Sequence, residues 1–297
     1  EDLNEQVNIL DEELARYPDV IAIASIDEDA SEVQFDLAAG NDIPIVAFDS
    51  GNVYQGIQCT CKTDNSAATA EGVSKLCEAI GDSGEVSLIV HDSVSESARE
   101  REEAFKAALS AEHPEVTVAE TIYMDELDEI KKSAAAEQLG VSLEEIQAQQ
   151  AAETTDQGEE QTGEASAVME EINTAAEGMS DEEAVAYCMK KHPDLKGCFG
   201  TNVDATQLGV KALGSMEESD DVVLMGFDAG AAQLEALESG EIDGLVVQNP
   251  FGIGYAAVIA SARTVLEIGN EAQVNTGYIW VDQENLEEDA VQAMLYE

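Results

Sequence analysis

Two apolar runs in this chain end in the same signature, and this repeat constrains the fold more than any other feature. The first run ends in Phe-Asp-Ser-Gly at residues 48–51 and the second in Phe-Asp-Ala-Gly at residues 227–230. A short apolar run bounded by turn residues predicts a strand buried on both faces of a parallel sheet. Ligands of open parallel sheets lie at the carboxyl ends of such strands. The repeat therefore predicts paired lobes, with Asp49 and Asp228 facing one cleft from opposite sides.

The size and charge of the chain narrow its class. Its 297 residues suffice for two compact domains, and it has no apolar run of the roughly 18 residues that a membrane span needs. The 64 acidic and 13 basic residues leave a formal net charge of −51. Nucleic acids and anionic lipids are attracted by Lys and Arg, so we expect neither nucleic-acid binding nor direct membrane insertion. We interpret the acidity as a solvated surface.

The sequence predicts no metal site and no disulfide framework. The acidic run 27–29 lacks the glycine and the spaced ligands of a calcium loop. The five cysteines are an odd number at irregular spacing, and Cys59 and Cys61 have no histidine nearby. We expect the cysteines to be small core residues, with a single disulfide as the alternative.

Strand and helix patterns alternate along most of the chain, which predicts an α/β fold with parallel sheets. Expected strands are 20–24, 43–48, 57–61, 86–91, 116–123, 197–199, 222–227, 244–247 and 278–281. Expected helices are 2–16, 30–40, 66–80, 97–111, 204–214, 231–238 and 251–268. The middle is irregular, and residues 145–168 are acidic, of low complexity and nearly devoid of large apolar residues. We interpret residues 145–168 as a surface insertion in one lobe, with a partner-binding arm as the alternative; its front could form a helix, and we expect its rear to be mobile.

Six segments carry a family resemblance. They are N-D-I-P-I-V-A-F-D at 41–49, K-T-D-N at 62–65, S-A-R-E-R-E-E-A-F at 97–105, H-P-D-L-K-G-C-F-G-T-N at 192–202, V-L-M-G-F-D at 223–228 and V-V-Q-N-P at 246–250. In this order they resemble the periplasmic sugar-binding proteins of the ribose-binding type, which share their core with the ligand domains of the lactose-repressor family. The resemblance covers nearly the whole chain.

The resemblance implies two Rossmann-like lobes with parallel sheets, joined by a three-strand hinge and closing on one sugar. The N-terminal lobe would comprise residues 1–63 and 249–274, and the C-terminal lobe residues 64–248 and 275–297. Relatives open with a strand, a helix and a strand that this chain does not match. We therefore expect a first lobe without these elements and a chain cut from a longer product.

The resemblance also implies a set of sugar-binding residues. They are Ser25, Asp49, Arg99, Asn202, Phe227, Asp228 and Gln248. The carboxylates would accept hydrogen bonds from hydroxyl groups, the guanidinium would donate, and the two amides would do both. Phe227 would shape an apolar wall. Alternatives stay open: Asp49 and Asp228 could cap helices, Arg99 could form a surface ion pair, and Asp204 could replace Asn202.

The implied function is an extracytoplasmic solute-binding protein that delivers a monosaccharide or similar polyol to the membrane permease of an ABC importer. We expect a monomer without a cofactor, held at the membrane by a lipid on an upstream segment. The alternative is the ligand-sensing domain of a transcriptional repressor or of a chemosensory receptor. A glycosidase using the two aspartates is disfavoured, because nothing marks one of them for a raised pKa. We therefore expect no enzymatic activity.

Overall fold

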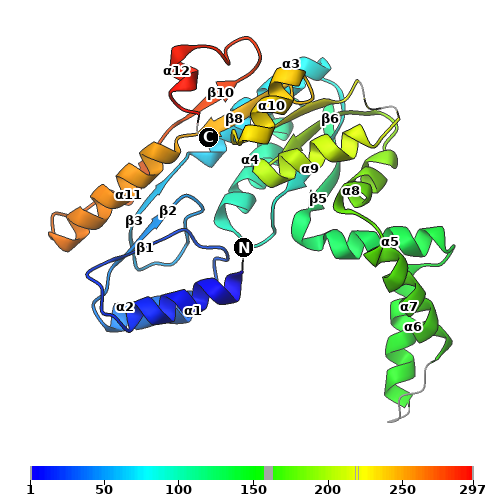
Figure 1. Cartoon of the computed structure of the whole chain (residues 1–297), viewed down its shortest axis with the longest axis horizontal. Helices are drawn as coiled ribbons and strands as arrows, with labels where there is room; N and C mark the ends of the chain where they lie inside the picture. Colours follow the sequence, from blue (N-terminus) through cyan, green and yellow to red (C-terminus); the bar gives the residue numbers. More distant parts are fainter. Residues whose placement is uncertain (1, 157–162, 218, 220, 296–297) are drawn as a thin grey trace.

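The structure, a computed structural model, contains two sheets and describes residues 2–156, 163–217, 219 and 221–295 (Figure 1). The first sheet has the order β1-β2-β3-β9 and is parallel throughout. Its strands are β1 (Ile21–Ile23), β2 (Ile45–Phe48), β3 (Ile57–Lys62) and β9 (Gln273–Asn275). Strands β1, β2 and β3 come from the beginning of the chain and β9 from near its end, so the first lobe is discontinuous in sequence.

The second sheet has the order β10-β8-β7-β6-β4-β5, and its neighbours are parallel except β10 against β8. Its strands are β4 (Gly84–Val90), β5 (Val116–Tyr123), β6 (Leu195–Gly200), β7 (Val223–Phe227), β8 (Gly244–Gln248) and β10 (Tyr278–Val281). The α/β architecture predicted from the alternating pattern is thus confirmed.

Helices cover both faces of each sheet (Figure 1). They are α1 (Leu3–Leu14), α2 (Glu32–Gly40), α3 (Asn65–Ile80), α4 (Glu96–Glu112), α5 (Leu127–Gln138), α6 (Leu143–Asp156), α7 (Glu164–Glu177), α8 (Asp181–Lys190), α9 (Val203–Gly214), α10 (Ala231–Ser239), α11 (Pro250–Val265) and α12 (Asp289–Gln292), with a 3₁₀ turn η1 (Met124–Glu126). In the first lobe, adjacent strand residues point to opposite faces. Ile45 packs with Phe35 of α2, whereas Val46 packs with Ala257 of α11.

The second lobe is organised by the same alternation. Leu88 of β4 faces the core formed with α3 and α4, and its neighbour Ile89 faces the core formed with α8 and α9. Three fully buried rings join the α4 side to the sheet: the ring centroids of Phe105 and Phe199 are 5.3 Å apart, and those of Phe199 and Phe227 6.0 Å apart. This aromatic cluster, with one tilted and one edge-to-face ring pair, lies behind the strand ends of β6 and β7.

The middle of the chain is helical: α6 covers the front of the 145–168 segment, where the sequence allowed a helix, whereas α5 and α7 were not predicted. Helices α5, α6 and α7 form an arm that projects from the second lobe (Figure 1). Ile146, Met169 and Ile172 are buried there with Ala135 and Ala136. Small alanines let these helices approach closely, so a few large side chains suffice for a core. Of the predicted insertion at 145–168, residues 157–162 lie outside the described residues.

All five cysteines are buried and unpaired, as expected for small core residues. The Sγ atoms of Cys59 and Cys61 lie 3.7 Å apart on one face of β3. Burial raises the pKa of the Cys61 thiol to about 12. The Cys59 and Cys61 thiols are therefore protonated packing groups.

The aromatic cluster should contribute strongly to the stability of the second lobe. Phe199→Ala is expected to lower the free energy of unfolding by about 3–5 kcal/mol, because it removes a fully buried ring and leaves a cavity. Phe251→Ala is the matched control, since its ring is 82% exposed, and should change stability by less than about 0.5 kcal/mol. Urea unfolding measures both. Equal losses in the two variants would contradict this assignment of the core.

Candidate functional site

A cavity of about 370 Å³ lies where the carboxyl ends of strands from both sheets meet. Ser25 and Asp49 reach it from the first sheet, following β1 and β2. Asn202, Asp228 and Gln248 reach it from the second sheet, at the ends of β6, β7 and β8. The remaining lining residues are Gln6, Ala24, Ile26, Ser50, His91, Asp92, Ser95, Ser97 and Arg101. Five of the seven predicted site residues thus line one cavity.

The two repeated aspartates adopt the same unusual backbone conformation. Asp49 has a φ of 54° and Asp228 a φ of 74°, in the left-handed region that few residues other than Gly, Asn and Asp visit. Neither caps a helix, since helix α10 begins after Gly230 and no helix follows Asp49 directly. The turns after both strands therefore leave each carboxylate beside the cavity, where Asp228 is 7% exposed and Asp49 is exposed.

The side-chain amides of Gln248 and Asn202 are held by hydrogen bonds to neighbouring residues. Gln248 donates from Nε2 to Asp228 Oδ1 at 2.8 Å and accepts at Oε1 from the Thr63 hydroxyl at 2.9 Å. Asn202 accepts at Oδ1 from the Ala205 backbone N–H at 2.8 Å and so caps α9. Asn202 is thereby both a lining residue and a helix cap. Its cap bond uses the side-chain oxygen and not the amide nitrogen.

Arg101 is the arginine that lines the cavity. Its side chain is almost fully buried, donates from Nε to Asn65 Oδ1 at 2.9 Å and from Nη1 to the Thr201 carbonyl, and lies over the Phe227 ring at 4.1 Å from the centroid. Hydrogen bonds from both edges and a ring beneath it leave the guanidinium in one orientation. It is therefore a rigid donor.

Two predicted site residues lie away from the cavity lining. Arg99 forms an ion pair with Glu28, which connects α4 of the second lobe to the loop after β1 of the first. Phe227 is fully buried and supports Arg101 from below rather than forming an exposed wall. Arg99 and Arg101 are two positions apart on α4, so they point to nearly opposite sides of the helix.

His91 directly follows β4, and its imidazole is held neutral. Nδ1 lies 2.7 Å from the Thr201 hydroxyl, and Nε2 lies 3.4 Å from the hydroxyls of Ser95 and Ser97. Burial, together with the positive charge of Arg101, lowers the pKa of His91 to about 4. A neutral imidazole can accept as well as donate a hydrogen bond, which suits a hydroxylated ligand.

Sequence signals for Arg101 and His91 existed but were not used in the prediction. Ala98, Arg101 and Phe105 recur at the helical spacing of a buried face, whereas Arg99 lies off that face. His91 follows a strand in the same way as Asp49 and Asp228. The same reasoning about strand ends that found the aspartates therefore applies to this histidine.

A family comparison decides the class of this fold. The model of the periplasmic binding protein domain matches residues 1–155 and 144–267. The chain belongs to this family. A search of curated proteins finds no match.

Solved structures of similar fold include three solute-binding proteins. A carbohydrate transporter protein from Agrobacterium radiobacter, in complex with D-arabinose, has a TM-score of 0.74 and 22% identity, covering 99% of this chain and 84% of its own. Two ABC transporter proteins from Agrobacterium vitis, with bound α-D-tagatopyranose and D-fucose, have TM-scores of 0.72 and 0.74 at 24% and 19% identity. They cover 98% and 99% of this chain, and 84% and 85% of their own.

These comparisons favour the solute-binding class over the repressor alternative and over an enzyme. Membership in a periplasmic binding protein family indicates a location outside the cytoplasm. Within the described part of the chain, no helix has the length and apolar character needed to cross a membrane. The TM-scores show a likeness of fold with these three proteins, whose sequence identities to this chain are all below 25%.

The neutral state of His91 predicts a specific loss of stability in acid. Between pH 6.5 and pH 4 the unfolded chain binds a proton at this residue and the folded chain does not, so stability falls as pH falls. Between pH 7.5 and 5.5 the protein should lose about 1.3 kcal/mol more unfolding free energy than His91→Gln, which lacks this group. Urea unfolding at both pH values measures the difference. Parallel pH profiles for the two proteins would refute a depressed pKa.

Proposed function

We propose that this protein captures a monosaccharide or related polyol between its two lobes and delivers it to an ABC importer. The observation that carries the proposal is the convergence of Ser25 and Asp49 from one sheet with Asn202, Asp228 and Gln248 from the other on one cavity. A ligand that touches both sets favours the closed arrangement, because only differential affinity shifts such an equilibrium.

The chemistry of the lining supports a hydroxyl-rich ligand. Asp49 and Asp228 are acceptors, Arg101 is a donor, and Asn202 and His91 can serve in both roles. Each charge-assisted hydrogen bond contributes roughly 1.5–3 kcal/mol. The bound D-arabinose, α-D-tagatopyranose and D-fucose of the neighbouring structures are monosaccharides of this kind. The cavity size also suits a single small ligand.

We place the lobe boundary where the chain crosses between the sheets, which divides it into 1–63 with 249–274 and 64–248 with 275–297. Hydrogen bonds join the three crossing segments. Thr63 donates to Gln248, the Asn249 amide donates to the Thr276 carbonyl at 3.1 Å, and the Thr276 backbone N–H donates to the Lys62 carbonyl at 3.1 Å. Because Gln248 also contacts Asp228, the hinge and the ligand site share a residue.

Closure also involves an ion pair outside the cavity. Glu28 and Arg99 lie on opposite lobes, with 11% and 42% of their side chains exposed. Opening the lobes would separate these charges and return them to water. In this proposal Arg99 stabilises the closed state through Glu28 rather than through the sugar.

Three further expectations complete the proposal. Surfaces of the two lobes beside the cleft would dock the membrane permease when the lobes close. The protein would act as a monomer, since one chain contains the whole cavity. Attachment to the membrane through a lipid remains a prediction of the family resemblance.

A panel of pentoses, hexoses and ketoses tests the function by thermal shift. At least one sugar is expected to raise the melting temperature, because ligand binding to the folded state alone stabilises it. Asp228→Ala should lower the affinity for that sugar roughly 10- to 100-fold, since it removes a charged acceptor from the cavity. Asp204→Ala is the control, because Asn202 and not Asp204 lines the cavity, and the variant removes the same charge from an exposed position.

Two outcomes would contradict the sugar assignment. No shift with any sugar would count against the ligand class. Equal affinities of Asp228→Ala and Asp204→Ala would reject the cavity as the binding site.

Variants of Glu28 and Arg99 test the ion pair. Glu28→Gln and Arg99→Gln should each lower sugar affinity by up to about fivefold, the range of a partly exposed ion pair, and the double variant should lose no more than either single one. Titration calorimetry measures the affinities. If Arg99 contacts the sugar instead, its variant will lose far more affinity than Glu28→Gln.

A further inference from the structure

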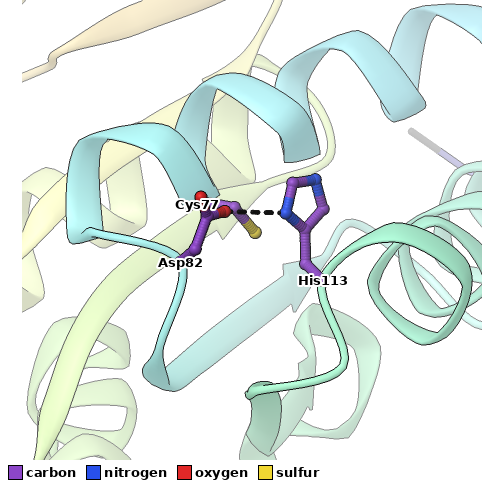
Figure 2. Close-up of side chains that lie close together, drawn as sticks. All are labelled: Cys77, Asp82 and His113. Atoms are coloured by element: carbon purple, nitrogen blue, oxygen red, sulfur yellow. Dashed lines mark hydrogen bonds and ion pairs between the residues drawn. The ribbon is translucent and has the colours of Figure 1, made fainter.

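Three side chains suited to metal binding meet at the edge of the second lobe far from the cavity. Cys77 lies in the last turn of α3, Asp82 in the turn after that helix, and His113 at the carboxyl end of α4. Figure 2 shows their side chains converging, with the Asp82 carboxylate directed at the imidazole. One potential ligand atom from each residue lies within 4.8 Å of the other two.

The surroundings of the three groups differ in a way that suits an ion. Cys77 is fully buried and the His113 side chain is 14% exposed, whereas Asp82 is 66% exposed. Asp82 Oδ1 lies 2.8 Å from His113 Nδ1. Nε2 of His113 is buried and has no hydrogen-bond partner among the described residues. In Figure 2 this second nitrogen points away from Cys77 and Asp82, so Nδ1 is the ring nitrogen that faces the other two groups, and the ion pair leaves the neighbouring thiol unused.

Thiolate, imidazole and carboxylate are the ligands that Zn²⁺ takes in proteins. With Zn–S of about 2.3 Å and Zn–N or Zn–O of about 2.0–2.1 Å, a tetrahedral ion places its ligand atoms about 3.3–3.6 Å apart. His113 Nδ1 and Asp82 Oδ1 lie 2.8 Å apart and would have to separate by about 0.5 Å to meet that spacing. Asp82 can supply most of the movement, because its side chain is exposed in a turn.

We propose that Cys77, Asp82 and His113 bind one Zn²⁺ ion, with water in the fourth position. The ion would join the carboxyl ends of α3 and α4, which pack against each other in the second lobe. Three protein ligands with an open fourth position are typical of accessible zinc sites rather than closed structural ones. The strongly negative chain favours the approach of any cation.

This site is separate from the sugar cavity. Asp82 precedes the start of β4, whereas His91 follows the end of the same strand. The strand has 7 residues, which at about 3.3 Å per residue puts roughly 23 Å between its ends. The two sites share no residue, so the zinc inference stands or fails independently of the proposed sugar function.

Cobalt binding tests the inference, because Co²⁺ bound by a cysteine thiolate shows a charge-transfer band in the near ultraviolet. The reduced full chain at pH 8 should develop this band and saturate with one Co²⁺ per chain, and Zn²⁺ should displace it. Burial, with the nearby Asp82 carboxylate, raises the pKa of the Cys77 thiol to about 11, so an alkaline buffer favours the required loss of its proton.

Matched variants show which residues bind the Co²⁺ that gives the band. Cys77→Ser should abolish it, and His113→Gln should weaken Co²⁺ binding at least about tenfold, because even indirect partners of metal ligands matter by that much. A Cys59→Ala/Cys61→Ala double variant should keep the band. No band in the native chain, or one lost only in the double variant, would overturn the site. His113→Gln changes a partly exposed residue and keeps the test decisive if Cys77→Ser fails to fold.

Discussion

The common direction of the strands is the constraint on which the rest of the structure depends. Parallel strands leave all their carboxyl ends at one edge of a sheet, and the helical crossovers return the chain to the other edge. Here two such edges face each other across one cavity. Short turns after β1, β2, β6, β7 and β8 can therefore bring polar groups from distant parts of the chain to one ligand. Left-handed backbone at Asp49 and Asp228 completes this arrangement.

A buried polar network holds the lobes and the site in register. Lys62 of β3 is nearly fully buried and pairs with Glu96 and Glu100 of α4. Glu100 also accepts from Asn65 at 2.8 Å, and Asn65 in turn accepts from Arg101. A buried charge without its partner costs several kcal/mol, so each member depends on the others. The network thereby connects the hinge strand of one lobe to the rigid donor of the cavity.

Local patterns predicted the parts of the fold that depend on local physics. Apolar runs located most strands, the strand-end rule located Asp49 and Asp228 at the cavity, and the family resemblance located Gln248 there. The choice between Arg99 and Arg101 required the buried face of α4, which is set by its packing on β4 and β5. Helices α5 and α7 were missed because alanines carry little apolar signal, although close packing still buries them.

The sequence by itself determined the α/β class and the paired strand endings with their aspartates, because these follow from periodicity and from turn chemistry, and the family resemblance implied the other polar groups. Only the tertiary structure decided which groups meet. It buried Arg101 over Phe227, paired Arg99 with Glu28 across the lobes, and placed His113 beside Cys77. Contacts of this kind join residues far apart along the chain. Their geometry depends on how the helices pack on the sheets, which no local pattern specifies.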